Sequence, residues 1–386
     1  MVLPLQRRTR VFSRLRSALL AGILGGGASL AGAAEIVIAQ IAPLSGVLAS
    51  TGQQMVLGAK VYFDFVNAHG GVNGAQIRTL VADDAYKVEQ TLALTREMVA
   101  RPEVVALFGM AGTANIGKLL QEDVLGKAGI ALVAPYTGGE PLRTPFNPWI
   151  FHLRAGYADE AEHMVKQLAT LGLQRVAVLY QDDAFGKAGL EGVVAALARR
   201  NLQVAVAAPY ERNTDRVDAA VKQVLEAKAQ SVIMIAINKP AAAFVKKYRE
   251  AGGGGQLFNI SVVDPAELVK LAGVENVRGL GITQVVPYPY QQRLPVVRQF
   301  HEQLAKFAPD ASVNYTNFEE YLGAKVLVEG LRRAGRNPTR ERLIKALESM
   351  TSFDLGGITV GYGPKQRVGS RFVEVTVIDS AGKLLK

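Results

Sequence analysis

The stretch that decides the fold is EIVIAQIAPLSGVLASTGQQMVLGAKVYFDFVNAHGGVNGAQIRTLVA, residues 35–82. It opens with the apolar run Glu35–Ile41, which is typical of a buried strand. The apolar side chains that follow recur with the spacing of one helical face: Met55, Ala59, Tyr62, Phe63 and Val66. Glycines at 70 and 71 then end the helix, and a second strand is expected at Ile77–Ala82.

The same alternation continues to about residue 134. We expect strands at Val104–Phe108 and Ile130–Ala134, with helices at about 87–100 and 113–128 between them. Strands that alternate with helices predict a parallel, doubly wound sheet. The proline- and glycine-rich loop 138–148 interrupts the alternation, and Trp149–Arg154 is expected to be a strand that leaves this first lobe.

A second series of helices and strands begins at about residue 157. Its helices are expected at about 157–171, 186–200, 214–228 and 240–251, and its strands at Arg175–Tyr180, Leu202–Ala207, Ser231–Ile237, Leu257–Ile260 and Gly279–Val285. After the proline-rich segment 287–295 come helices at about 296–307, 317–334 and 339–349 and a strand at 371–378. The fold class is therefore α/β, with two doubly wound lobes joined by crossover hinges. The expected division is 35–154 plus 287–355 for lobe 1 and 155–286 plus 356–386 for lobe 2, with a ligand cleft between them.

Residues 1–34 have the order of a secretory signal peptide. Five arginines form a basic head, Ser17–Leu30 is apolar and glycine-rich but too short to span a bilayer, and small residues close the segment. We expect cleavage after Ala33 or Ala34 and a periplasmic location. Because five of the 44 Lys and Arg and none of the 34 Asp and Glu lie in this segment, the net charge falls from +10 to +5. The remaining charges are mixed in sign, so nucleic acid is not an expected partner.

Several kinds of chemistry have no support in the sequence. It contains no cysteine, which excludes disulfides, thiolate metal sites, a cysteine nucleophile and a lipid-anchored N-terminus. Gly112–Leu119 is a near miss for a phosphate-binding loop, but Leu119 stands where the Ser or Thr for Mg²⁺ should be. The GxSxG and HExxH motifs of hydrolases are absent, and the four histidines are dispersed. We therefore expect no enzymatic activity, no metal and no cofactor.

A set of motifs runs in order from residue 42 to residue 378. They are APLSGVLASTGQQMVLGAKVYFDFVNAHGGVNG (42–74), VADDAY (81–86), FGMAGTAN (108–115), VAPYTGGEPLR (133–143), VLYQDDAFGKAGLEG (178–192), DLGG (354–357) and GSRFVEVTVI (369–378). Together they resemble type I periplasmic solute-binding proteins of ABC importers, in particular the branched-chain amino acid (Leu/Ile/Val) binding group. The resemblance implies reversible ligand binding between two hinged lobes, without chemistry.

The first lobe offers a site for a carboxylate. Open α/β sheets bind ligands at the carboxyl ends of their strands, and the loop after Phe108 leads into a helix start whose N–H groups suit an anion. In the resembled family this loop and the one after the next strand hold the ligand's α-carboxylate. The matching residues are Ala111, Gly112, Thr113, Tyr136 and Thr137. Thr113 is alternatively only a helix N-cap. Tyr136 stands where the family often has a small residue, which allows an aromatic or branched ligand side chain to stack on it.

The second lobe is expected to close over the ligand. Tyr157 follows the crossover, and Phe185 stands where the resembled family usually places an aromatic residue that covers the ligand. For Phe185 the alternative is an ordinary core position. Asn238 follows the Ser231–Ile237 strand, at another strand end that faces the cleft. Thr51, in the first motif, completes this part of the expected ligand-binding set.

The ammonium group of an amino acid needs an acid. Asp264 matches the family's acidic position best, but Asp264-Pro265-Ala266-Glu267 is also a helix start, with an N-cap Asp, Pro at N1 and Glu at N3. Asp159 is a second candidate. If neither acid faces the cleft, the ligand is a simple carboxylate or an aromatic acid.

The expected function is capture of an amino acid or related small carboxylate and its delivery to the permease subunits of an ABC importer. We expect the protein to act as a monomer. The alternative on the same fold is a sensor that reports its ligand to a membrane receptor, which the sequence does not separate from transport.

Overall fold

The first sheet has five parallel strands in the order β2-β1-β3-β4-β5. The computed structural model describes residues 34–386, so the predicted signal peptide lies outside the described residues except for Ala34. The strands are β1 (Glu35–Ala42), β2 (Gln76–Asp83), β3 (Val104–Phe108), β4 (Ala131–Val133) and β5 (Ile150–Phe151). Every residue of β1 after the first is buried, as expected for a parallel sheet that helices cover on both faces. We call the part built on this sheet the first lobe.

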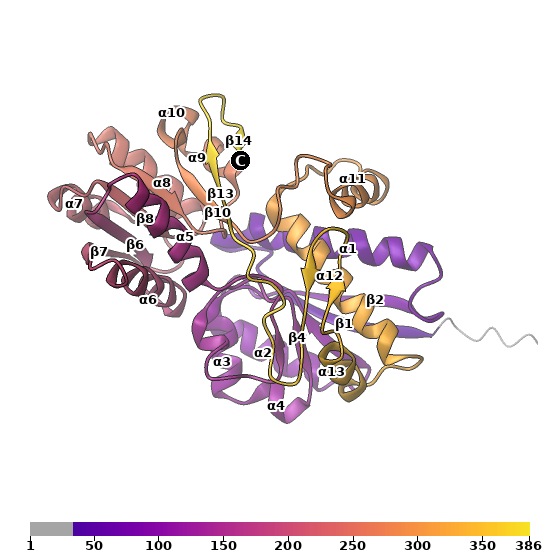
Figure 1. The fold of residues 1–386 in the computed structure, drawn as a ribbon. Coiled ribbons are helices and arrows are strands. Elements are labelled where there is room, and N and C mark those ends of the chain that lie inside the picture. Colours follow the sequence, from indigo (N-terminus) through magenta and orange to yellow (C-terminus); the bar gives the residue numbers. More distant parts are fainter. Residues whose placement is uncertain (1–33) are drawn as a thin grey trace, which may run out of the picture. The chain divides into compact units, whose positions relative to one another are not determined.

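Helices from both ends of the chain pack on this sheet. The N-terminal set is α1 (Ala49–Ala68), α2 (Val88–Val99), α3 (Thr113–Gln121) and α4 (Val124–Ala128), with 3₁₀ turns η1 (Gly46–Leu48) and η2 (Glu140–Leu142). The C-terminal set is α11 (Pro295–Phe307), α12 (Tyr315–Ala334) and α13 (Arg340–Glu348). Figure 1 shows α12, in orange, beside the indigo α1. The single helix predicted at 113–128 is instead two, because Asp123 takes a left-handed conformation (φ 51°) that ends α3.

The close approach of α1 and α12 depends on a glycine. A Cβ at Gly58 would lie 2.0 Å from the backbone oxygen of Asn317, so only glycine lets the two helices meet there. Phe318 and Tyr321 continue this contact into the core, and Tyr321 packs edge-on against Tyr62 at 5.2 Å. The far C-terminal α12 is thereby tied to the N-terminal strand–helix unit.

The second sheet has seven strands in the order β14-β13-β10-β9-β8-β6-β7, and the part built on it is the second lobe. Its strands are β6 (Val176–Gln181), β7 (Val204–Tyr210), β8 (Ser231–Ile235), β9 (Gln256–Asn259), β10 (Gly281–Gln284), β13 (Glu374–Ile378) and β14 (Leu384–Leu385). Its helices are α5 (Tyr157–Thr170), α6 (Ala184–Ala198), α7 (Asp218–Glu226), α8 (Asn238–Glu250), α9 (Pro265–Ala272) and α10 (Val274–Val277). β7 extends past the predicted end at residue 207 and through Pro209, which is tolerated because β7 is an edge strand. The two C-terminal strands join antiparallel.

After residue 369 the chain passes from the first lobe to the second. A small hairpin of β11 (Phe353–Asp354) and β12 (Thr359–Val360) precedes this crossing. The backbone of His152, next to β5, donates to Arg367 and accepts from Gly369, both at 2.8 Å. Because this segment pairs with the first lobe, we propose that the lobe boundary lies near residue 369 rather than at the expected residue 356.

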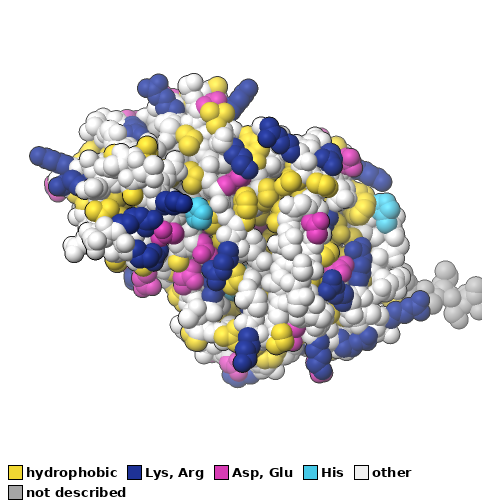
Figure 2. All heavy atoms as spheres, in the orientation of Figure 1, with side chains coloured by type: hydrophobic (Ala, Val, Ile, Leu, Met, Phe, Trp, Pro, Cys, Tyr) yellow, Lys and Arg dark blue, Asp and Glu magenta, His cyan; other side chains and the backbone are white. Residues whose placement is uncertain are grey.

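The face of the molecule in Figure 2 carries Lys and Arg side chains scattered among Asp and Glu. Within residues 34–386, no helix is both long enough and apolar enough to cross a membrane.

Candidate ligand-binding site

A small cavity lies where several predicted site residues converge. Its volume is about 20 Å³, and it is lined by Leu48, Tyr86, Ala111, Gly112, Tyr136, Tyr157, Phe185, Ile237 and Val262. Residues 48–136 of this set belong to the first lobe and residues 157–262 to the second, so the cavity is shared between the lobes. Four of its side chains are aromatic, and we call it the aromatic compartment.

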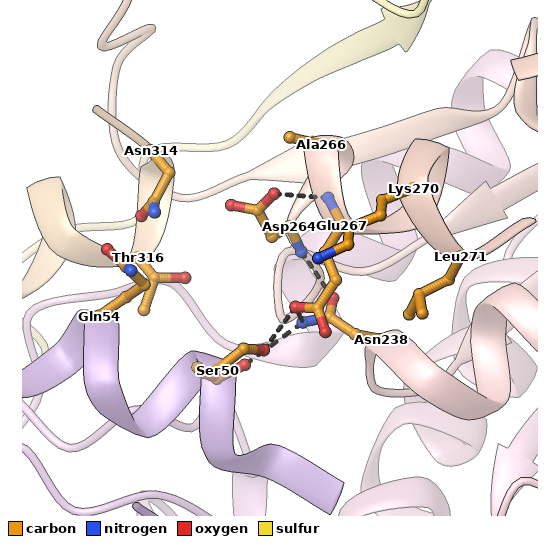
Figure 3. Close-up of a pocket in the computed structure, with 11 residues that line it drawn as sticks. Ser50, Gln54, Asn238, Asp264, Ala266, Glu267, Lys270, Leu271, Asn314 and Thr316 are labelled. Atoms are coloured by element: carbon orange, nitrogen blue, oxygen red, sulfur yellow. Dashed lines mark hydrogen bonds between the residues drawn. The ribbon is translucent and has the colours of Figure 1, made fainter. Parts of the chain in front are cut away.

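A larger cavity of about 340 Å³ is also built from both lobes (Figure 3). It is lined by Ser50, Thr51, Gln54, Asn314 and Thr316 of the first lobe and by Asn238, Asp264, Ala266, Glu267, Lys270 and Leu271 of the second. Nine of these eleven residues carry an amide, a hydroxyl or a charge, and we call the cavity the polar compartment. The predicted residues Thr51, Asn238 and Asp264 therefore meet in a cavity of their own, separate from the aromatic one.

Tyr136 lies between the two compartments. Its ring lines the aromatic compartment, and its hydroxyl lies 3.1 Å from that of Thr316, which lines the polar one. The guanidinium of Arg154 lies over the Tyr136 ring, 4.7 Å from the ring centroid. Such a cation–π contact is worth about 2 kcal/mol when desolvated. Burial raises the pKa of Tyr136 far above its ordinary value, so its hydroxyl stays protonated and can donate to Thr316.

Thr113 and Thr137 line neither compartment. Their hydroxyl oxygens lie 2.7 Å apart, and Thr137 also accepts from the backbone N–H of Gly139 and lies 3.3 Å from the Tyr157 hydroxyl. The N-cap of α3 is Gly112, not Thr113, so the capping alternative for Thr113 is wrong. Gly112 adopts φ 100°, and a Cβ there would lie 2.8 Å from the Tyr86 ring.

Asp264 is the N-cap of α9, as the helix-start alternative predicted. Its carboxylate accepts from the backbone N–H of Glu267 at 2.9 Å, and burial raises its pKa. The reciprocal bond of a capping box is not formed. The Glu267 carboxylate instead accepts from Asn238 at 2.6 Å and from the Ser50 hydroxyl, and Figure 3 shows these bonds across the compartment.

Glu267 is thus an acid of the site that sequence reasoning assigned only to helix capping. The sequence signal for Glu267 was its position three residues after Asp264, because the side chain of an N3 residue can either turn back to the N-cap or point away from it. Asp159, the other candidate acid, lies elsewhere: its carboxylate accepts from the backbone of Gly156 and pairs with Arg371.

Arg212, which follows β7, was not singled out by the sequence; it lines neither compartment but contacts Tyr86, which lines the aromatic one. It donates to the Tyr86 backbone oxygen and to Asn115, both at 2.7 Å, and its guanidinium lies 4.1 Å from the Tyr86 ring centroid. The Asp183 carboxylate, which also belongs to the second lobe, forms an ion pair with the Arg212 guanidinium at 2.6 Å. Arg212 therefore links the second lobe to two elements of the first.

Phe185 is oriented by the same Asp183. The Asp183 carboxylate caps α6 by accepting from the backbone N–H groups of Phe185 and Gly186 at 3.0 and 3.2 Å. The Phe185 ring meets Tyr157 edge-on at 5.5 Å. Phe185 is buried in a hydrophobic cluster, as the core alternative predicted, and it also lines the aromatic compartment.

A buried cluster of charges joins the lobes behind the compartments. Arg154, 0% exposed, lies 3.4 Å from Glu319 of α12 and donates to Ser261 of the second lobe. Glu160 of α5 accepts from the backbone N–H of Ser261 at 2.8 Å and from Thr283 at 2.6 Å. Nε and Nη1 of Arg154 have no hydrogen-bond partner among residues 34–386. The guanidinium is therefore held mainly by charge.

Glu320, next to Glu319, gives the stability of the protein a pH dependence. Burial, and after it the nearby Glu319, raises its pKa well above the ordinary 4.5. A raised pKa means that the folded state holds the proton more tightly, so this contribution is complete below pH 4.5 and is lost as the pH rises through the folded-state pKa.

We expect Glu320→Gln, which stays neutral, to gain stability relative to the wild type as the pH rises above 4.5, by up to about 1.4 kcal/mol per pH unit. Guanidinium unfolding at pH 4.5 and pH 8 measures this difference. Glu302→Gln, at an exposed position on α11, is the control. If the curves of wild type and Glu320→Gln ran parallel across this range, the assignment would fail.

The fold and the two shared cavities are those of a bilobed ligand-binding protein. The family model described as "Periplasmic binding protein" matches residues 35–383, and the chain belongs to this family. Within it the chain is a type I protein of the Leu/Ile/Val-binding kind, as the sequence resemblance predicted.

Individual relatives agree with this assignment. The chain is 26% identical over 381 residues to Leu/Ile/Val-binding protein homolog 8 of Brucella suis biovar 1, with 92% of this chain and 90% of that protein covered. A substrate-binding periplasmic protein from Ralstonia solanacearum is similar in structure, with TM-score 0.87, 39% identity and coverage of 91% and 99%. A branched-chain amino acid ABC transporter protein from Thermus thermophilus with bound valine shares the fold, with TM-score 0.82, 20% identity and coverage of 92% and 94%.

Proposed function

We propose that the protein captures an amino acid or related small carboxylate between its lobes and delivers it to the permease subunits of an ABC importer. It acts without catalysis, as a monomer in the periplasm, after removal of residues 1–34. The observation that carries the proposal is the polar compartment, in which Glu267 and Lys270 approach one 340 Å³ cavity. An acid and a base in one cavity suit the ammonium and carboxylate of a zwitterion.

Binding and closure are coupled in this proposal. The contacts of Arg212 with Tyr86 and of Ser50 with Glu267 join the two lobes, and they exist only while the lobes are together. A ligand that contacts both lobes shifts the equilibrium toward the closed form by its differential affinity for that form. The closed form then presents both lobe surfaces to the permease.

A thermal-shift screen of the mature protein against amino acids, aliphatic acids and aromatic acids tests the proposal. A binder at a hundredfold excess over its dissociation constant stabilises the folded state by about 2.7 kcal/mol, which raises the melting midpoint by several degrees. Binding only by acids that lack an amine would favour the second candidate, an aromatic or aliphatic acid. No stabilisation by any compound of the three classes would contradict the proposal.

We expect Glu267→Gln to weaken binding of the amino acid that the screen identifies by about 10- to 100-fold, since a charge-assisted hydrogen bond is worth about 1.5–3 kcal/mol. Binding of the same compound without its amine should change little. Isothermal titration calorimetry measures both.

Asp264→Asn is the matched control, because asparagine is also a good N-cap. If Asp264→Asn abolished amino acid binding while Glu267→Gln did not, Asp264 would be the ammonium ligand and the assignment to Glu267 would be wrong.

A further inference from the structure

We propose that Tyr136 sets the specificity of the site: it withholds the aromatic compartment from the ligand, so that zwitterions with a polar side chain bind better than those with a branched apolar one. This inference rests on the proposed function and names the ligand class within it. It concerns the side chain of the ligand, whereas the proposed function concerns its charged groups.

The position of Tyr136 is set from three directions. Its backbone N–H donates to the Met110 oxygen at 2.7 Å, its hydroxyl lies 3.1 Å from that of Thr316, and Arg154 lies over its ring at 4.7 Å. The side chain is 4% exposed. Arg154 is itself held by Glu319 and Ser261. Moving the ring would break all three contacts at once, so the ring forms a fixed wall.

The wall leaves little room on its aromatic side. A cavity needs a volume of about 10–15 Å³ to hold one water molecule, and the aromatic compartment has about 20 Å³. An isobutyl or benzyl group does not fit there while the Tyr136 ring is in place. An apolar ligand side chain must therefore stay in the polar compartment.

The polar compartment suits a different side chain. Gln54 and Asn314 place amide groups around it, beside the hydroxyl of Thr316 and the ammonium of Lys270. An apolar side chain there would take hydration from these groups without replacing their hydrogen bonds, which is unfavourable. An amide or hydroxyl on the ligand would replace them. Asparagine and leucine make a matched pair of ligands, because they have the same number of heavy atoms and differ mainly in the polarity of the side chain.

Calorimetric titration of the mature wild type and of Tyr136→Ala with L-asparagine and L-leucine tests the inference. We expect the wild type to bind asparagine at least about tenfold more tightly than leucine, the scale on which a site discriminates small differences in side chains. Removing the ring joins the two compartments and exposes an apolar lining, so Tyr136→Ala should bind leucine at least about tenfold more tightly than the wild type does. Tyr136→Phe keeps the ring, so its ratio of the two dissociation constants should stay on the side of asparagine.

Two outcomes would overturn the inference while leaving the proposed function intact. One is a wild type that binds leucine as tightly as asparagine or more tightly, which needs no variant. The other is a folded Tyr136→Ala protein whose ratio of dissociation constants equals that of the wild type. If the wild type bound no amino acid and no carboxylate of the screen, the proposed function would fail and this inference with it.

Discussion

Replacing Arg154 by alanine is expected to lower the free energy of unfolding by about 3–5 kcal/mol, since removing one partner of a buried ion pair leaves an uncompensated charge. Arg154 is fully buried, and Glu319 and Glu160 would lose the cation between them. Burial already raises the pKa of Glu319, so the loss should be smaller at acidic pH, where this carboxyl is protonated. Guanidinium unfolding followed by the fluorescence of Trp149, the single tryptophan, measures the change.

Arg371→Ala is the control for Arg154→Ala. Arg371 also pairs with a carboxylate, that of Asp159, but its side chain is 70% exposed. Exposed pairs of this kind contribute about 0–1 kcal/mol. A loss for Arg154→Ala no larger than that for Arg371→Ala would mean that the buried cluster does not depend on its cation.

Replacing Arg212 by alanine is expected to weaken binding of the amino acid found in the screen by up to about 100-fold, which corresponds to loss of about 3 kcal/mol of charge-assisted hydrogen bonding. The reason is that Arg212 bonds to Tyr86 and Asn115 of the first lobe. Without it the closed form is less populated, and the apparent dissociation constant rises in inverse proportion to that population. Calorimetric titration measures the affinity, and thermal unfolding checks that the variant is folded.

Arg216→Ala provides the comparison. Arg216 lies in the same loop and pairs with Glu211, but both side chains are more than 60% exposed and the pair lies within the second lobe. It should leave the dissociation constant within about twofold of the wild type, given the small energies of exposed pairs. Equal losses for Arg212→Ala and Arg216→Ala would show that the loop affects binding without the contact between lobes.

The secondary structure and the fold class could be predicted because local patterns encode them. The run Glu35–Ile41 is β1, and the glycines at 70 and 71 follow the end of α1. Asp123 divides the helix predicted at 113–128, and the edge position of β7 lets it include Pro209. β5 (Ile150–Phe151) and β13 (Glu374–Ile378) are shorter than the strands predicted at 149–154 and 371–378. The sequence of β7 does not reveal its edge position, because an edge position is a property of the whole sheet and not of one strand.

The candidate site was predicted in part. Ala111, Gly112, Tyr136, Tyr157 and Phe185 do converge on one cavity, because the carboxyl ends of parallel strands share one edge of a sheet. Glu267 and Arg212 were missed. Glu267 reaches Ser50 and Arg212 reaches Tyr86, and both partners are far away in the sequence and in the opposite lobe.

By itself the sequence determined the α/β architecture, the two lobes and the family, because apolar periodicity, glycine stops and an ordered set of motifs are properties of neighbouring residues. Only the tertiary structure decided that Asp264 serves as a helix cap while Glu267 turns into the polar compartment, and that Tyr136 divides the space between the lobes. The direction of a side chain with two available partners depends on which partner the fold brings within hydrogen-bond distance. That distance is set by the packing of α1, α9 and α12, and no local pattern of residues contains it.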